Sequence, residues 1–116
     1  MSEWEDRFFF EISALGLPHP ERQYKFHPSR KWRMDFFWKL RDDCALCVEI
    51  QGGIYANGRH SRGAGYEKDM EKWNEAVLMG YDLFIFGPTH IKNGMGLEYV
   101  KRWLKKNEKN DIPSLI

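Results

Sequence analysis

The stretch from Cys44 to Gly53 constrains the fold more than any other part of this chain. It reads Cys-Ala-Leu-Cys-Val-Glu-Ile-Gln-Gly-Gly, and a short apolar run closed by glycines predicts a buried strand of a central sheet. Glu49 interrupts the run. A buried, unpaired carboxylate is costly, so Glu49 needs a cation, a hydrogen-bond donor or an open cleft beside it. An acid at the end of a core strand, followed by two glycines, suggests a metal site.

Length and composition indicate one globular domain spanning residues 1–116. The chain is 42% hydrophobic and 30% charged, and no apolar run approaches the roughly 20 residues that span a bilayer. The N-terminus, Met-Ser-Glu-Trp-Glu-Asp, is acidic, which is typical of neither a signal peptide nor a transit peptide. We therefore expect no membrane partner and a cytoplasmic location.

Hydrophobic periodicity predicts an α/β fold with a mixed sheet of about four strands flanked by helices. The expected order is αβββαβα, with a glycine-rich loop over Gly52–Gly65 between the third strand and the second helix. The expected helices span Ser2–Gly16, Tyr66–Met79 and about Gly96–Lys106, and the expected strands span Arg22–His27, Arg33–Trp38, Cys44–Gln51 and Tyr81–Phe86.

Three finer expectations concern how side chains face the core. In the first helix Trp4, Phe8, Ile12 and Leu15 should be buried, and in the second helix Tyr66, Met70, Trp73 and Val77. In the second strand Asp35 should share a face with Phe37, and Met34 should share the other face with Phe36. Cys44 and Cys47, three residues apart in one strand, should lie on opposite faces, which argues against a shared zinc ion or a disulfide.

Asp35 and Glu49 lie on strands joined by a polar turn at Arg41-Asp42-Asp43. The two strands should be antiparallel, and one register places these acids near each other. Opposed side chains on such strands have Cβ atoms about 4.5–5.5 Å apart, and two carboxylates that close repel unless a cation lies between them. The residues therefore suggest a divalent ion, although Asp35 could equally pair with a nearby arginine.

The net charge of +1 says little, but basic residues surround this acidic centre in the sequence. Such a distribution fits a polyanion substrate, and on charge alone ordinary solvated surface explains it equally well. The basic groups are Arg22, Lys25, His27, Arg30, Lys31, Arg33, Arg59, His60, Arg62, Lys101, Arg102, Lys105 and Lys106.

The order of these segments resembles the PD-(D/E)XK nuclease superfamily, and more narrowly small phage and bacterial domains related to the VRR-NUC and very-short-patch repair groups. The segments that carry the resemblance are Glu5-Asp-Arg-Phe8, residues 26–37, Val48-Glu-Ile-Gln-Gly-Gly53, Gly58-Arg-His-Ser-Arg-Gly63 and residues 66–74. The resemblance covers nearly the whole chain up to Phe86. It implies a restriction-endonuclease-like core and a bacterial or phage origin.

The resemblance also implies roles for individual residues. Asp35, Glu49 and the backbone carbonyl of Ile50 would bind Mg²⁺, with Mn²⁺ able to substitute. Gln51 stands where the superfamily usually has a lysine, and glutamine can orient water or phosphate but carries no charge. The other candidate catalytic residues are Glu5, His60, Lys68, Asp69 and Lys72.

The activity that this resemblance implies is metal-dependent endonucleolytic hydrolysis of DNA. Flanking phosphates and bases would contact Arg30, Lys31, Arg33, Tyr55, Arg59 and Arg62. A junction-resolvase-like enzyme, which a homodimer would favour, and a sequence-specific nicking enzyme are open alternatives. So are a catalytically inactive nucleic-acid-binding domain, which the missing lysine favours, and a protein-interaction domain.

Overall fold

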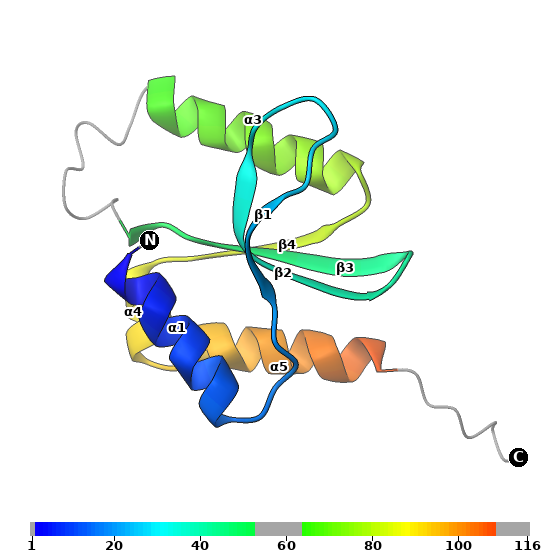
Figure 1. The fold of residues 1–116 in the computed structure, drawn as a ribbon. Coiled ribbons are helices and arrows are strands. Elements are labelled where there is room, and N and C mark those ends of the chain that lie inside the picture. Colours follow the sequence, from blue (N-terminus) through cyan, green and yellow to red (C-terminus); the bar gives the residue numbers. More distant parts are fainter. Residues whose placement is uncertain (1, 53–63, 109–116) are drawn as a thin grey trace, which may run out of the picture.

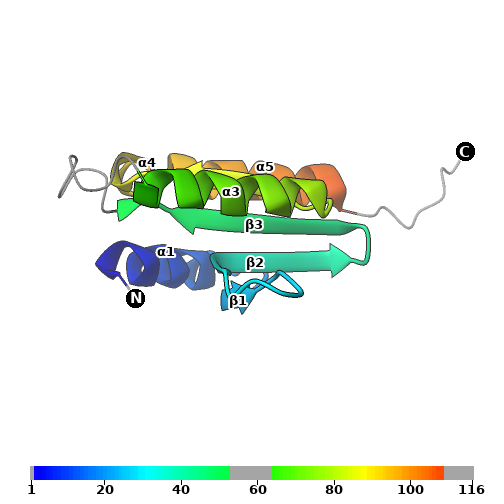
Figure 2. The same cartoon turned by 90° about the horizontal axis from the view of Figure 1, so that it is seen from above.

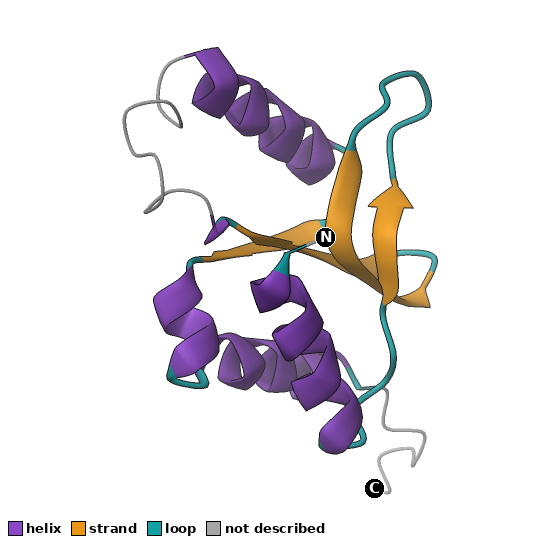
Figure 3. Ribbon diagram, turned by 60° about the vertical axis from the view of Figure 1, so that its left-hand side comes forward, coloured by secondary structure: helices purple, strands orange, loops and turns teal. Residues whose placement is uncertain are grey.

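A computed structural model describes residues 2–52 and 64–108 of the chain. It consists of a four-stranded sheet with helices on both faces (Figure 1). Helix α3 covers one face, and α1, α4 and α5 cover the other (Figures 1 and 3). The elements are α1 (Glu3–Ala14), β1 (Glu21–Lys25), β2 (Arg33–Arg41), β3 (Cys44–Ile50), α3 (Ala64–Leu78), β4 (Asp82–Phe86), α4 (Pro88–Lys92) and α5 (Met95–Asn107).

The α/β class and the four-stranded mixed sheet are confirmed. The strands lie in the order β1-β2-β3-β4, with antiparallel β1–β2 and β2–β3 pairs and a parallel β3–β4 pair. Figure 2 shows β2 and β3 running side by side and joined by a tight turn. The short helix α4 was not expected from the sequence. Pro88 stands at its first turn, where a missing N–H costs nothing.

Strand β3 is buried along its whole length. Leu46, Val48 and Ile50 pack in the core on the side of α1 and α5, whereas Ala45 and Cys47 pack in the core on the side of α3. Cys44 packs with the first group, and both cysteines are free. The prediction that Cys44 and Cys47 lie on opposite faces is therefore confirmed, and alternation places Glu49 on the α3 side.

Helix α1 begins as its sequence predicts. The Ser2 hydroxyl accepts a hydrogen bond from the Glu5 backbone N–H at 3.1 Å, and three acids lie in the first turn, where they favour the helix dipole. Phe8 and Ile12 are fully buried. The prediction that Leu15 is buried was wrong, because the helix ends at Ala14 and Leu15 is exposed.

The expected inward face of the second helix was only partly right: Trp73 packs against the core as predicted, but two of the other expected inward residues do not. Met70 and Val77 are exposed, whereas Ala76 is fully buried and the Lys72 side chain is only 12% exposed. Apolar periodicity did not include Lys72 among the inward residues. The helix instead turns Lys72 toward the buried Glu49, whose carboxylate would otherwise be buried without a cation.

The expected alternation along β2 was also wrong at one point. Phe36 and Trp38 pack on the side of α1 and α5, as expected, but Met34 packs on the side of α3 together with Phe37. Residues two apart in a regular strand share a face, so the alternation is interrupted at Asp35. This interruption lies beside the cluster of acids described next.

None of the described helices is long and apolar enough to cross a bilayer.

Candidate functional site

Glu49 is the buried acid on which the site is built, with 3% of its surface exposed. The strand alternation of β3 directs it toward α3, where the Lys72 ammonium lies 2.6 Å from its Oε1. The Trp73 indole N–H donates to the same oxygen at 3.5 Å. Helix α3 thus supplies the cation that the buried carboxylate needs.

Asp35 meets Glu49 at the point where β2 and β3 stop pairing. The last paired residues are Phe36 and Val48, so Asp35 and Glu49 occupy the next opposed positions. The Asp35 backbone N–H donates to Glu49 Oε2 at 3.1 Å, and the Ile50 backbone N–H donates to Asp35 Oδ2 at 2.8 Å. Each carboxylate thus accepts a backbone N–H from the opposite strand. The predicted proximity of Asp35 and Glu49 is confirmed.

Glu5 joins these acids through a residue that the sequence did not single out. The amide Nε2 of Gln23, on β1, donates to Glu5 Oε1 at 3.0 Å and to Asp35 Oδ1 at 3.2 Å. The Ser2 hydroxyl donates to Glu5 Oε2 at 3.3 Å. Glu5 is itself buried. The sequence offered one signal for Gln23, its place on the strand before Asp35. That signal is not specific, because polar residues are common on short strands.

The close acids perturb one another. Burial, and then the charge of Asp35, raise the pKa of Glu49 to about 7, although Lys72 lowers it. Burial and the charge of Asp35 also raise the pKa of Glu5. The Lys72 ammonium at 2.6 Å therefore only partly offsets the cost of burying Glu49 beside a second carboxylate. A strongly perturbed group with identified charge partners is typical of functional sites.

The raised pKa of Glu49 predicts a pH dependence of stability. A free glutamate has a pKa of 4.5 and the folded one of about 7, so the folded protein binds more protons between these values. The free energy of unfolding should therefore fall as pH rises through that window, by at most about 3 kcal/mol from this group. Chemical denaturation of the wild-type protein from about pH 5 to about pH 8 measures it.

Two variants isolate the contribution of Glu49 to that profile. Glu49→Gln should remove most of the fall, because its amide does not titrate. Glu98→Gln, on the exposed first turn of α5, should retain it. Parallel profiles of wild type and Glu49→Gln would contradict the assignment.

Of the remaining predicted catalytic residues, the structure places some near the acids and others away from them. Asp69 is half-buried on α3, and burial raises its pKa; the charge of Lys72 lowers that pKa and the charge of Asp35 raises it. Lys68 is exposed on α3. The Gln51 backbone N–H donates to the Phe86 carbonyl at 2.8 Å, and the residue is half-buried. Lys72, rather than Gln51 or Lys68, therefore provides the ammonium beside the acids.

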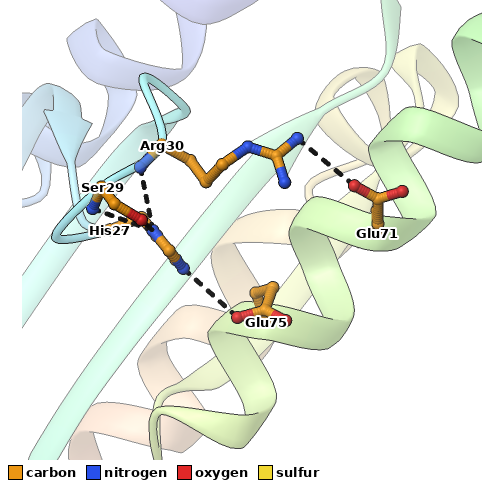
Figure 4. A network of polar contacts seen from close by, with 5 residues as sticks. All are labelled: His27, Ser29, Arg30, Glu71 and Glu75. Carbon is orange, nitrogen blue, oxygen red and sulfur yellow. Dashed lines mark hydrogen bonds and ion pairs between the residues drawn. The ribbon is translucent and has the colours of Figure 1, made fainter.

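A polar network ties the loop after β1 to α3 (Figure 4). The His27 Nδ1 accepts the backbone N–H groups of Ser29 and Arg30 at 3.2 and 3.0 Å, and its Nε2 lies 3.2 Å from Glu75 Oε1. Because Nδ1 accepts, Nε2 carries the proton and donates to Glu75. The ring thereby fixes the loop that carries Arg30.

The predicted phosphate-binding residues that the structure describes lie on the surface. Arg30 forms an ion pair with Glu71 at 3.3 Å, and its guanidinium lies 3.8 Å from the centre of the Trp32 ring. Lys31 and Arg33 are exposed. Tyr55, Arg59, His60 and Arg62 lie outside the described residues.

The donor set of the site is compatible with a hard divalent cation. Asp35 and Glu49 provide carboxylate oxygen atoms as ligands. Within residues 2–52 and 64–108, no cluster of three or more His, Cys, Asp or Glu side chains is arranged to hold a metal ion. Mg²⁺ commonly binds through one or two carboxylates, with water and substrate phosphate completing its shell. Two carboxylates therefore fit Mg²⁺ but not a closed structural site such as that of zinc.

Comparison with known proteins identifies no relative: the chain matches no family model, no curated protein and no solved structure. The resemblance to nucleases therefore stays a prediction from the sequence.

Proposed function

We propose that this protein is a Mg²⁺-dependent endonuclease that hydrolyses DNA phosphodiester bonds. The observation that carries the proposal is the meeting of Asp35 and Glu49, joined at 3.1 Å through the Asp35 backbone N–H, with the Lys72 ammonium 2.6 Å from Glu49. Two carboxylates and an ammonium, of which Glu49 and Lys72 are largely buried and Asp35 is half-buried, form a set that can hold a divalent ion and a phosphate together. On this proposal the protein acts in the cytoplasm of a bacterium or of a phage-infected bacterium.

Asp35 and Glu49 would bind the ion, and the Ile50 carbonyl is a further candidate ligand. An ion bound there would polarise a phosphate oxygen and lower the pKa of a bound water. The chain already provides nitrogen donors to both acids, from Lys72 to Glu49 Oε1 and from Gln23 to Asp35 Oδ1. These donors partly offset the negative charge of the two carboxylates, which a bound ion would neutralise in the working enzyme.

Lys72 has the position to act on the substrate. Its ammonium carries three N–H donors, and the structure uses one of them for Glu49. The other donors can stabilise the charge that develops on the phosphate oxygens in the transition state. Lys72 would thus replace, from a helix, the strand lysine whose place Gln51 takes.

The surface around the acids suits a polyanion. Lys68, Arg30, Lys31 and Arg33 are exposed on α3, on the loop after β1 and at the start of β2. Contacts from such groups to phosphates release counterions, so DNA affinity should fall steeply as salt rises. Arg30 would exchange its surface ion pair with Glu71 for a phosphate, which costs little because exposed pairs are weak.

A catalytically inactive nucleic-acid-binding domain is the second candidate. The uncharged Gln51 favours it, since the strand then provides no general base or ammonium. The two candidates differ in their dependence on metal. An inactive binding domain should bind DNA equally well with chelator, whereas the enzyme should need a divalent ion for turnover.

Incubation with plasmid, single-stranded and four-way-junction DNA tests the proposal directly. We expect cleavage of at least one substrate with Mg²⁺ or Mn²⁺ and none with chelator. Preferential cleavage of the junction by a homodimer would identify a resolvase-like enzyme. DNA binding without cleavage of any substrate under either ion would contradict the enzyme and favour the binding domain.

A further inference from the structure

Gln23 has a backbone conformation that a strand residue rarely adopts. Its φ is 54°, and it is the one non-glycine with a positive φ among the residues that the structure describes. A side chain with a Cβ is strained there, and such conformations persist only where the surrounding structure compensates for them. A glycine at this position would relieve the strain, so the side chain of Gln23 needs an explanation.

The strained backbone changes the direction of β1. Arg22 pairs with Phe36 and Tyr24 with Met34, so Gln23 faces Asp35. The Arg22 guanidinium lies over Phe36, in the core beside α1, whereas Tyr24 stacks on Phe37 at 3.9 Å in the core beside α3. Residues two apart normally share a face. The two strands thus change face at opposed positions, Gln23 on β1 and Asp35 on β2.

The side chain of Gln23 uses both of its N–H donors at this point. Its Nε2 donates to Glu5 Oε1 at 3.0 Å and to Asp35 Oδ1 at 3.2 Å. A primary amide has two donors on that nitrogen. Because two carboxylate oxygens can only accept, the NH₂ group, and not the amide oxygen, must face them. Asp35 is held from the other side by the Ile50 backbone N–H at 2.8 Å.

We propose that Gln23 is a positioning residue, which orients the Asp35 carboxylate for a divalent ion and connects Glu5 to the same site; this inference rests on the ion-binding site of the proposed function. Without the amide, Asp35 would keep one of its two side-chain hydrogen bonds, and Glu5 and Asp35 would repel with no donor between them. Hydrogen-bond partners of metal ligands typically contribute 10–100-fold to metal affinity.

The test compares Mn²⁺ binding by isothermal titration calorimetry for wild type, Gln23→Gly and Gln23→Leu. Gln23→Gly removes the amide and the backbone strain together, whereas Gln23→Leu removes the amide and keeps the strain. We expect the Mn²⁺ dissociation constant to rise about 10-fold or more in both variants. We expect the melting temperature of Gln23→Gly to stay at or above that of wild type, since glycine adopts a positive φ freely.

A matched variant and a kinetic readout separate positioning from a general loss of structure. Lys25→Gly places a glycine at an exposed position of the same strand and should leave Mn²⁺ affinity unchanged. Cleavage by Gln23→Gly should recover when the Mn²⁺ concentration is raised about 10-fold, in proportion to the weaker binding. A purely structural role would not produce that recovery.

The outcomes are distinguishable. Gln23→Gly binding Mn²⁺ as tightly as wild type would overturn the positioning role and leave the proposed function intact. A wild-type protein that binds no Mn²⁺ at all would overturn both. Weaker Mn²⁺ binding by Gln23→Gly together with a matching loss in Lys25→Gly would show that glycine in β1 is responsible, and would also overturn the role of the amide.

Discussion

Cleavage of DNA should fall by about 10³-fold or more when Asp35 is replaced by asparagine or Glu49 by glutamine. Each change keeps the size of the side chain and removes one of the two carboxylates that meet where β2 and β3 separate. Two carboxylates supply two negative charges to a bound ion, and replacing one of them by an amide removes half of that charge. Initial rates with Mg²⁺, on whichever DNA the wild-type protein cleaves, measure the effect.

Binding measurements on the same variants connect this loss to the ion. Mn²⁺ affinity should fall with either change, whereas DNA affinity in chelator should not fall, since removing a negative charge does not weaken attraction to phosphate. Glu98→Gln, on the opposite side of the sheet, is the matched control and should cleave at the wild-type rate. Variants that retain more than about a tenth of the wild-type rate would contradict the roles given to these acids.

Truncation of Phe36 to alanine should cost about 3–5 kcal/mol of the free energy of unfolding. Phe36 has no exposed surface, and its ring lies against Phe8 at 5.4 Å and near Trp38 at 6.4 Å between ring centres. Removing the ring leaves a cavity between the sheet and α1 that neighbouring rings cannot fill. Since domains of this size are stable by only about 5–15 kcal/mol, the variant should be close to unfolding. Urea titration measures the loss.

Phe10→Ala provides the matched control for the same change of side chain. Phe10 lies on α1 and is 70% exposed, so its truncation should change the free energy of unfolding by less than about 0.5 kcal/mol. Similar losses for the two variants would show that Phe36 does not occupy the core as described. Because Phe36 adjoins Asp35, reduced cleavage by Phe36→Ala is interpretable only where the variant remains folded.

Much of the fold could be predicted because the elements carry local signals. The run from Cys44 to Ile50 has few polar residues, and the capping serine with its acids marks the start of α1. Asp35 and Glu49 could be paired because the turn at Asp42-Asp43 places the two strands in an antiparallel hairpin. The site could be predicted to that extent, since a short hairpin leaves few registers available.

The face of α3 could not be predicted in the same way. Its apolar residues favoured Met70 and Val77 as inward positions, yet both are exposed and Lys72 is inward. Helical periodicity counts apolar side chains, whereas the orientation of α3 also depends on a carboxylate 23 residues earlier in the chain. That dependence is a property of the packed structure.

By itself, the sequence determined the α/β class and the approximate boundaries of most elements, and it placed two acids on neighbouring strands of one hairpin, because each of these depends on residues close together in the chain. The register that brings the two acids together came from the structure. Only the tertiary structure decided that Lys72 forms an ion pair with Glu49. It also decided that the Gln23 amide donates hydrogen bonds to both Glu5 and Asp35. Both contacts bring together side chains from separate elements, and neither leaves a periodic or spaced pattern in the sequence. The positive φ of Gln23, which glutamine does not favour, occurs in the structure together with the two hydrogen bonds of its amide.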